Sequence, residues 1–405
     1  LKRVASQQGL VCLLHEKPFA GINGSGKHDN WSIVTNTGIN LLNPGPAPHD
    51  NKQFLLFLSA VIKAVDENAA LLRMSASNPG NDHRLGANEA PPAIISIFLG
   101  EQLEDIVEQI IATGTATHSI KGEKMDIGVS SIPPVKKDAT DRNRTSPFAF
   151  TGNKFEFRMV ASSMSIAGAN TVLNTAVADV LEGMADELAG AADFDSAVDT
   201  LIQKTLKEHQ KVIFNGNGYS DEWVAEAERR GLPNVKTMVD ATASLVYPKT
   251  IEIFERQNVL TKVELESRAE INYEAYAKAI NIEAKTMIEM AAKQYIPSII
   301  KYTTSLADSV NQIKSACPEA TVSVQTELLT KCSALLAKAQ SALNTLIEVT
   351  DKGCAMEEGK EQAEFYRDSV FTAMSELRTP IDELEMLVDK EYWPVPSYGD
   401  LIFEV

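Results

Sequence analysis

Apolar and polar positions follow two different patterns on either side of residue 190. Before it, short apolar runs alternate with loops that contain glycine and proline, which is typical of strands and helices joined by turns. After it, apolar residues recur at intervals of three and four, the spacing of one face of a helix. The sequence therefore predicts a region of strands and helices followed by an all-α region.

Strands are predicted at residues 10–15, 31–35 and 153–160 of the first region. The third of these alternates strictly between apolar and polar residues, so that Glu156 and Arg158 are neighbours on its polar face. We therefore expect this strand to be half-buried, with its phenylalanines toward the core.

Helices are predicted over residues 50–73 and from about residue 161 onward, because their apolar residues repeat at helical spacing. Another is expected to begin at Pro91, since proline suits the first turn of a helix. The polar and irregular stretch 113–146 is expected to be a long loop or insertion.

The second region is dominated by long helical patterns, and residues 258–293 contain neither proline nor glycine. Residues 326–349 carry a coiled-coil-like seam. Gly353 is expected to end that helix, and residues 356–390 to return beside it as an antiparallel hairpin. The tail from Trp393 is expected to be an extended strap. The predicted seam consists of Leu328, Cys332, Leu335, Ala339, Ala342 and Leu346.

Composition narrows the class of protein. The 405-residue chain has a net charge of -17 at pH 7, which disfavours a general nucleic-acid partner. No apolar run is long enough to span a membrane, and the four cysteines have no metal-binding spacing. These features indicate a protein of the reducing cytoplasm. The chain begins at Leu1 rather than Met, so we expect an upstream part.

Four short clusters carry residues suited to chemistry. The turn Asn23-Gly24-Ser25-Gly26 exposes backbone N–H groups to a ligand, and the histidine at position 28 is a potential metal ligand. Arg84 is suited to a carboxylate and Glu89, on the same loop, to a lid. The other two clusters are Asp141–Ser146, with Arg144 for phosphate, and the Glu156–Arg158 strand. Taken singly, each cluster is more typical of a surface turn or loop, a solvated charge run or a cross-strand ion pair than of a functional site.

Together the clusters resemble the glutamine synthetase family. Residues 17–32 are similar to its signature K-P-x-x-x-x-N-G-S-G-x-H-x-x-x-S at every fixed position. The other three resemble its R-L-x-P-G-x-E-A-P, R-N-R-S and E-x-R segments, in the family's order. The second lacks the proline and is one residue shorter, and Ala149 stands where the family usually has another arginine. The helical C-terminal region and the 113–146 insertion are similar to the type III branch.

The resemblance implies an α+β fold. Residues 1–190 would be the C-terminal part of the catalytic domain, a curved antiparallel sheet with helices, and residues 191–405 a helical extension. The family's β-grasp domain and its other metal-binding carboxylates are not recognisable in this sequence, so residues 1–405 alone are expected to be inactive. The resemblance also implies a dodecamer of two stacked hexameric rings.

The implied reaction joins ammonia to L-glutamate with ATP, giving glutamine, ADP and phosphate through γ-glutamyl phosphate, with Mg²⁺ or Mn²⁺ as cofactor. The residues to which the resemblance assigns roles are His28 and Glu156 for the metal, Asn23, Gly24, Arg84 and Arg158 for glutamate, Ser32 and Arg144 for ATP, Arg144 also for the transferred phosphoryl group, and Glu89 as the cap that binds ammonium.

Two other functions stay open at this stage. A γ-glutamyl-amine ligase on the same fold would need an apolar pocket where Glu89 is expected to cap the site. A non-catalytic scaffold or regulatory paralogue is favoured only by Ala149 and the shortened lid loop. Metal- and ATP-dependent formation of an acyl phosphate would separate an enzyme from a scaffold.

Overall fold

The computed structural model divides the chain into two compact units, residues 14–269 and residues 1–13 with 270–405. The boundary lies inside helix α11 (Lys262–Met290), so it does not coincide with the change of pattern near residue 190. The predicted division into catalytic domain and extension stays a prediction. The residues that the structure describes are 1–12, 14–17, 19, 21–86, 90–120, 124–125, 135–136, 143–397 and 400.

The described part of the first unit contains a four-stranded sheet in the order β1 (Asp29–Trp31), β6 (Phe155–Phe157), β5 (Phe148–Phe150), β2 (Ile97–Phe98). β6 runs antiparallel to both of its neighbours, whereas β2 and β5 are parallel. The sheet is thus mixed rather than wholly antiparallel as expected. A parallel pair needs a long crossover connection, and residues 99–147 supply one.

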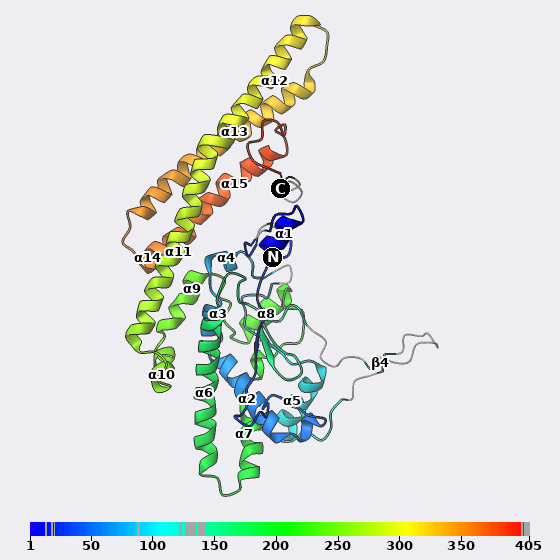
Figure 1. Ribbon diagram of the computed structural model, residues 1–405, viewed down its shortest axis with the longest axis vertical. Coiled ribbons are helices and arrows are strands. Elements are labelled where there is room, and N and C mark those ends of the chain that lie inside the picture. The colour runs from blue at the N-terminus through cyan, green and yellow to red at the C-terminus, as the bar shows by residue number, and fades with distance from the viewer. Residues whose placement is uncertain are drawn as a thin grey trace. The chain divides into compact units, whose positions relative to one another are not determined.

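One face of this sheet is an aromatic core. Phe148 stacks on Phe155 with ring centroids 4.9 Å apart, and Phe54 of helix α2 (Lys52–Glu67) reaches Phe150 at 5.8 Å. Helices α6 (Ala167–Ala189) and α7 (Phe194–His209) pack against α2 (Figure 1). On β1, Trp31 of the same face donates a hydrogen bond from its indole N–H to Asn174 on α6.

The opposite face of the sheet carries Glu156, with Ala149 directly across from it on β5. Both Glu156 and Arg158 are buried, at 2% and 4% exposure, so the expected half-buried strand is buried on both faces. The error has a physical cause: a polar face indicates exposure to solvent only when no loops cover it, and here the loops that carry His28, Arg84 and Asn143 contact Glu156 and Arg158.

Two other predicted elements are wrong. No strand is present among the described residues of 10–15. The helix expected from Pro91 begins only at α5 (Glu101–Thr113), after Gly100 at φ 83°, a left-handed conformation that favours glycine. The apolar run before it forms β2, because a short apolar run suits a buried strand as well as a helix.

The remaining bounds of regular structure are α1 (Lys2–Gln7), α3 (Ala69–Ser75), α4 (Pro79–Asp82), β3 (Lys124–Met125), β4 (Val135–Lys136), α8 (Asp221–Arg229), α9 (Met238–Thr242), α10 (Pro248–Arg256), α12 (Ile296–Ala316), α13 (Ser323–Cys354), α14 (Lys360–Phe365) and α15 (Phe371–Glu385). The predicted helix 50–73 is therefore α2 followed by α3. The pair β3–β4 lies within the predicted insertion 113–146.

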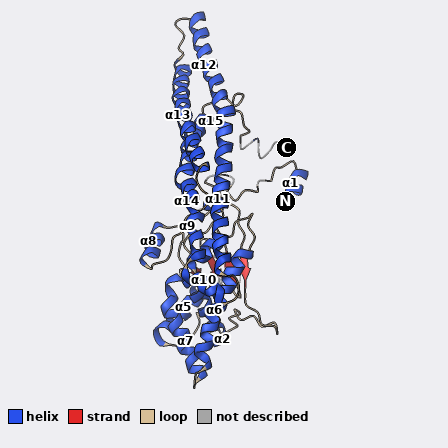
Figure 2. Ribbon diagram, turned by 90° about the vertical axis from the view of Figure 1, so that its left-hand side faces the viewer, coloured by secondary structure: helices blue, strands red, loops and turns tan. Residues whose placement is uncertain are grey.

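In the second unit, α13 packs against both α12 and α15 along its length (Figure 2). The predicted hairpin is thus present, and α13 ends at Cys354, one residue after the Gly353 that is expected to end it. A Cβ at Gly353 would approach the ring of Tyr366 to 3.0 Å, so this glycine permits close packing. The seam buries Leu343 rather than the predicted Ala342, together with Cys332, Leu335, Ala339 and Leu346. No described helix has the length and apolar composition to cross a bilayer.

Candidate functional site

The glycine turn at residues 23–26 lies directly against Arg84. A Cβ on Gly26 would fall 2.0 Å from a terminal guanidinium nitrogen of Arg84, and one on Gly24 would fall 2.6 Å from the carbonyl oxygen of Glu16. Only glycine leaves the space that this approach requires. Beyond the turn, the amide of Lys27 donates to the carbonyl of Val160 at 2.8 Å, which links the turn to the chain after β6.

Arg84 is held in one position by the loops around it. Its guanidinium donates to Asn81 Oδ1 at 3.0 Å and to the carbonyls of Met159 at 3.2 Å and Arg158 at 3.3 Å. Burial lowers the pKa of Arg84, and the charge of Glu16 acts against that shift. Its Nε is buried and has no hydrogen-bond partner among the described residues. The side chain is therefore fixed and keeps a donor group inside the site.

Glu156 and Arg158 form a buried ion pair at the end of β6. Arg158 donates from Nε at 3.2 Å and from Nη2 at 3.1 Å to the same oxygen, Oε2 of Glu156. The Nδ1 atom of His28 lies 3.5 Å from that oxygen, and the histidine side chain is 52% exposed. The exposed imidazole of His28 thus presents one nitrogen, and the buried carboxylate of Glu156 one oxygen, that could each serve as a metal ligand.

The third cluster, whose described residues 143–146 we term the arginine-rich loop, contacts the Glu156–Arg158 pair through Asn143. The carbonyl of Asn143 accepts a hydrogen bond from Nη1 of Arg158, while the adjacent Arg144 is exposed. The structure thus brings together Gly24, Arg84, His28, Glu156 and Arg158, and places Arg144 at their edge. Ser32 makes a structural contact instead: its hydroxyl lies within hydrogen-bond distance of two acceptors, Asn40 Oδ1 at 2.9 Å and the carbonyl of Asn153 at 3.0 Å.

The remaining site predictions have different outcomes. Asn23 is described and exposed on the glycine turn. Glu89, the predicted cap, lies outside the described residues. The roles assigned to all of these residues remain predictions, because proximity alone does not test a role.

Sequence reasoning missed several supporting residues. Glu16 is buried, and its carboxylate accepts from the amide of Ser163 at 2.9 Å and from the Ser163 hydroxyl. Burial acts to raise the pKa of Glu16, but these hydrogen bonds outweigh it and lower the pKa. Asn143 and the run Asn215-Gly216-Asn217-Gly218 were also missed. The repeated Asn-Gly pairs were a signal for tight turns, but not for what the turns contact.

No group of three or more His, Cys, Asp or Glu side chains in the described part of the chain is arranged to hold a metal ion. His28 and Glu156 are nevertheless both metal-ligand types, because carboxylates suit Mg²⁺ and Mn²⁺ and imidazole is a common ligand of transition metals. A metal bound through two protein ligands keeps positions for substrate oxygens. The pair therefore fits a metal that also binds substrate.

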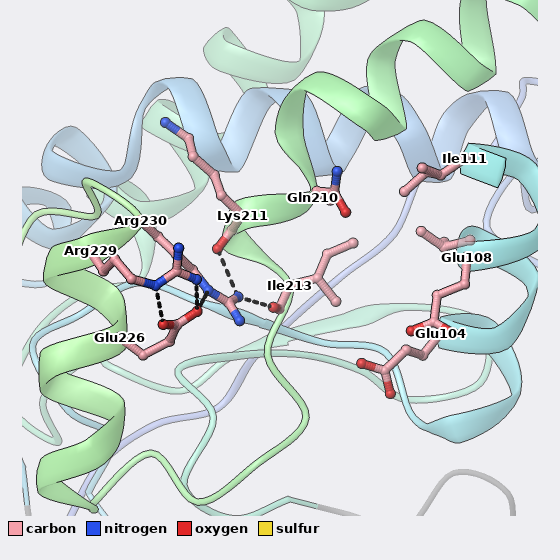
Figure 3. A pocket seen from close by; sticks show the side chains of 10 residues that line it. Glu104, Glu108, Ile111, Gln210, Lys211, Ile213, Glu226, Arg229 and Arg230 are labelled. Atoms are coloured by element: carbon pink, nitrogen blue, oxygen red, sulfur yellow. Dashed lines mark hydrogen bonds and ion pairs between the residues drawn. The ribbon is translucent and has the colours of Figure 1, made fainter.

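A separate cleft of about 360 Å³ lies elsewhere in the same unit and contains none of these residues (Figure 3). Glu104 and Glu108 form one wall. On the other wall Glu226 accepts hydrogen bonds from Arg229 and Arg230, and Arg230 also donates to the carbonyl of Ile213. On the second wall the charges of Glu226, Arg229 and Arg230 pair with one another, and none of the predicted site residues lines the cleft, so we do not place the functional site there.

Comparison with known proteins agrees with the motifs. Residues 197–314 match the family model described as the glutamine synthetase C-terminal domain. Over its whole length the chain is 44% identical to a type-3 glutamine synthetase of Dictyostelium discoideum, 42% to a glutamine synthetase of Butyrivibrio fibrisolvens and 37% to one of Bacteroides fragilis. The chain spans 56%, 58% and 57% of the lengths of these relatives. The matched domain and the similarity along the entire chain show that it belongs to the glutamine synthetase family.

Proposed function

We propose that the protein containing this chain ligates ammonia to L-glutamate with ATP and forms glutamine, ADP and phosphate through γ-glutamyl phosphate. The observation that carries the proposal is the convergence of Arg84, Arg158, Glu156 and His28, which come from three sequence clusters, into one network in which the first three are buried and His28 is exposed. The names of the related proteins support the same activity.

The chemistry requires charge to be neutralised. A glutamate carboxylate and the phosphates of ATP repel each other, so cations must offset both before the carboxylate can attack. His28 and Glu156 would hold a Mg²⁺ or Mn²⁺ ion, which supplies that neutralisation when bound. The buried guanidiniums of Arg84 and Arg158 act in surroundings of low dielectric, where each charge has a stronger effect than in water.

Each remaining residue has a proposed task. Arg84 and Arg158 grip glutamate, with Asn23 and Gly24 positioning it through amide groups. Arg144, exposed at the edge of the network, stabilises the moving phosphoryl group and contacts ATP, which Ser32 also approaches. Glu89 caps the site, binds ammonium and excludes the water that would hydrolyse the acyl phosphate. We further propose a cytoplasmic dodecamer of two stacked hexameric rings.

A hydroxamate assay on the full-length protein tests this function. γ-Glutamyl hydroxamate formation with Mg²⁺ or Mn²⁺ is expected in the wild type. His28→Ala is expected to raise the metal concentration needed for half-maximal rate by at least about 10- to 100-fold, the loss typical of removing only an outer-shell partner of a ligand, because His28 is proposed to bind the metal directly. His118→Ala is the matched control, since His118 contacts Thr117 and none of the site residues.

Three results would change the assignment. A wild type that forms no hydroxamate or acyl phosphate with ATP would point to a scaffold or regulatory paralogue. A strong preference for a primary amine over ammonia would make the protein a γ-glutamyl-amine ligase. An unchanged metal requirement in His28→Ala would remove His28 from the proposed metal site.

A further inference from the structure

A segment far along the chain reaches back to the arginine-rich loop. Asn143 donates from Nδ2 to the carbonyls of Asn215 at 3.1 Å and Gly216 at 2.6 Å, and the amide of Gly218 donates to Thr145 Oγ1 at 2.8 Å. Residues 215–218 belong to the stretch 197–314 that matches the C-terminal domain of the family. A region that the sequence presents as a helical extension thus contacts the site directly.

Asn143 is the centre of these contacts. Both donors of its amide are used on residues 215 and 216, and its Oδ1 accepts from the amide and hydroxyl of Thr145 at 3.0 and 2.7 Å. Its own carbonyl accepts from Arg158. A side-chain amide with its donors and acceptor engaged has one favoured orientation. Asn143 therefore connects Arg158 to residues 215–218, and Arg144 lies between Asn143 and Thr145 in sequence.

The 215–218 segment is itself anchored. The Oδ1 atom of Asn215 accepts from the amides of Leu99 at 2.9 Å and Gly100 at 3.0 Å, where β2 ends. The ring of the preceding Phe214 stacks on Trp223, with centroids 3.7 Å apart. A Cβ on Gly218 would lie 2.9 Å from the carbonyl oxygen of Thr145, so the approach requires glycine. Residues 215–218 are therefore held in one position by their own contacts, so they can fix the position of Asn143 and Thr145.

We propose that Asn143, Thr145, Asn215 and Gly218, which we term the asparagine clasp, are positioning residues for phosphoryl transfer. The clasp fixes the backbone that carries Arg144 and the guanidinium of Arg158. These two arginines address opposite partners of the reaction, the phosphoryl group and the glutamate carboxylate, so their separation must be held closely. A misplacement of about 1 Å at such a site can cost about 100-fold in rate. The inference rests on the proposed glutamine synthetase activity.

Thr145→Val in the full-length protein is the sharpest test. Valine keeps the shape of threonine but removes the hydroxyl that donates to Asn143 and accepts from Gly218. We expect kcat to fall by about 10- to 100-fold while the KM for ATP changes by less than about threefold, because contacts to bound nucleotide survive and alignment does not. Thr145→Ser, which restores the hydroxyl, should restore most of kcat.

A double-mutant cycle separates positioning from general damage. Because the clasp acts through both Arg144 and Arg158, Thr145→Val should have a smaller effect on kcat in an Arg144→Ala background than in the wild type, and the remainder should come from Arg158. Fully additive losses, or a wild-type kcat in Thr145→Val, would overturn the proposal. Should Thr145→Val fail to fold, as judged by circular dichroism, Gly218→Ala takes its place with the same expectations. An inactive wild type would overturn the proposed function and this inference together, whereas an active wild type with an unaffected variant would overturn only the clasp.

Discussion

The site in residues 14–269 and the helices of the second unit are stabilised in opposite ways. In the site, the charged side chains of Arg84, Glu156 and Arg158 are buried and held by hydrogen bonds from loops. In the helices, apolar residues of α13 form the interior, and charges such as Glu289 and Lys293 pair on the surface one turn apart. Buried charges depend strongly on their partners, whereas exposed pairs contribute little. The two regions should therefore respond differently to comparable substitutions.

The largest expected effect is at the buried ion pair. Glu156→Ala leaves the guanidinium of Arg158 buried without its carboxylate, which should lower the free energy of unfolding by about 3–5 kcal/mol. Glu289→Ala, which breaks an exposed pair with Lys293, should change it by at most about 0.5 kcal/mol. Urea denaturation of both variants measures the difference, and equal losses would contradict the comparison.

In the helical region, the largest loss of stability is expected from a substitution in the apolar seam of α13. Leu346 is fully buried in α13, so Leu346→Ala should lower the free energy of unfolding by about 2–5 kcal/mol through lost contacts and a cavity. The neighbouring Ile347 is 36% exposed, and Ile347→Ala should cost much less. Denaturant titration followed by far-UV circular dichroism checks this pair. Similar losses in the two variants would mean that the seam is not where this packing is concentrated.

A pH effect is expected near the site rather than in the helices. Asp82, two residues before Arg84, accepts from Arg73 and from the amide of Met238, yet burial raises its pKa to about 6. Because the folded-state pKa is raised, the contribution of Asp82 to stability is full below its ordinary pKa and is lost as the pH rises through 6. The change should be on the order of 2 kcal/mol between pH 4 and pH 7.

Asp82→Asn should remove this dependence, which chemical denaturation across that pH range can measure relative to the wild type. Other carboxyl groups titrate in both proteins, so only the difference between them reports on Asp82. Parallel pH profiles for wild type and variant would contradict the prediction.

The smallest expected changes in the free energy of unfolding are those of two glycine-to-alanine substitutions, one at the site and one in a helix. Gly24→Ala places a Cβ 2.6 Å from the carbonyl of Glu16 and should lower the free energy of unfolding by about 1–3 kcal/mol, because the turn has to move. Gly183, within α6, has open space at its Cβ position, so Gly183→Ala should raise it by about 0.5–1 kcal/mol through helix propensity. Thermal unfolding of both variants should show shifts of opposite sign.

Much of the helical region could be predicted from the sequence. The absence of proline and glycine located α11, and apolar spacing located α13, because a helix buries one face and the spacing records which face that is. The error there concerns the seam, where Leu343 replaces the predicted Ala342, whereas the helix end expected at Gly353 lies one residue later, at Cys354. Local patterns do not contain the shape of the neighbouring helix.

At the site, by contrast, the sequence predicted the residue types but not their tertiary arrangement. The motifs identified the family and named candidate residues. They did not predict that loops would cover this face of the sheet. The candidates named were Arg84, His28, Glu156 and Arg158. The expected half-buried strand is buried on both faces, and the helix expected at Pro91 is delayed to Glu101 by the turn at Gly100. Loops that contact Glu156 and Arg158 decided the first outcome, and the pairing of β2 with β5 together with the turn at Gly100 decided the second.

The sequence by itself thus determined the family, the identity of the chemical groups and the helical character of the C-terminal region, because these depend on residue type and local periodicity. Only the tertiary structure decided that Gly26 makes room for Arg84, that Arg158 shares the carboxylate of Glu156, and that Asn143 joins residues 215–218. These contacts link residues distant in the chain, and their stability comes from burial and hydrogen-bond geometry that no local pattern records.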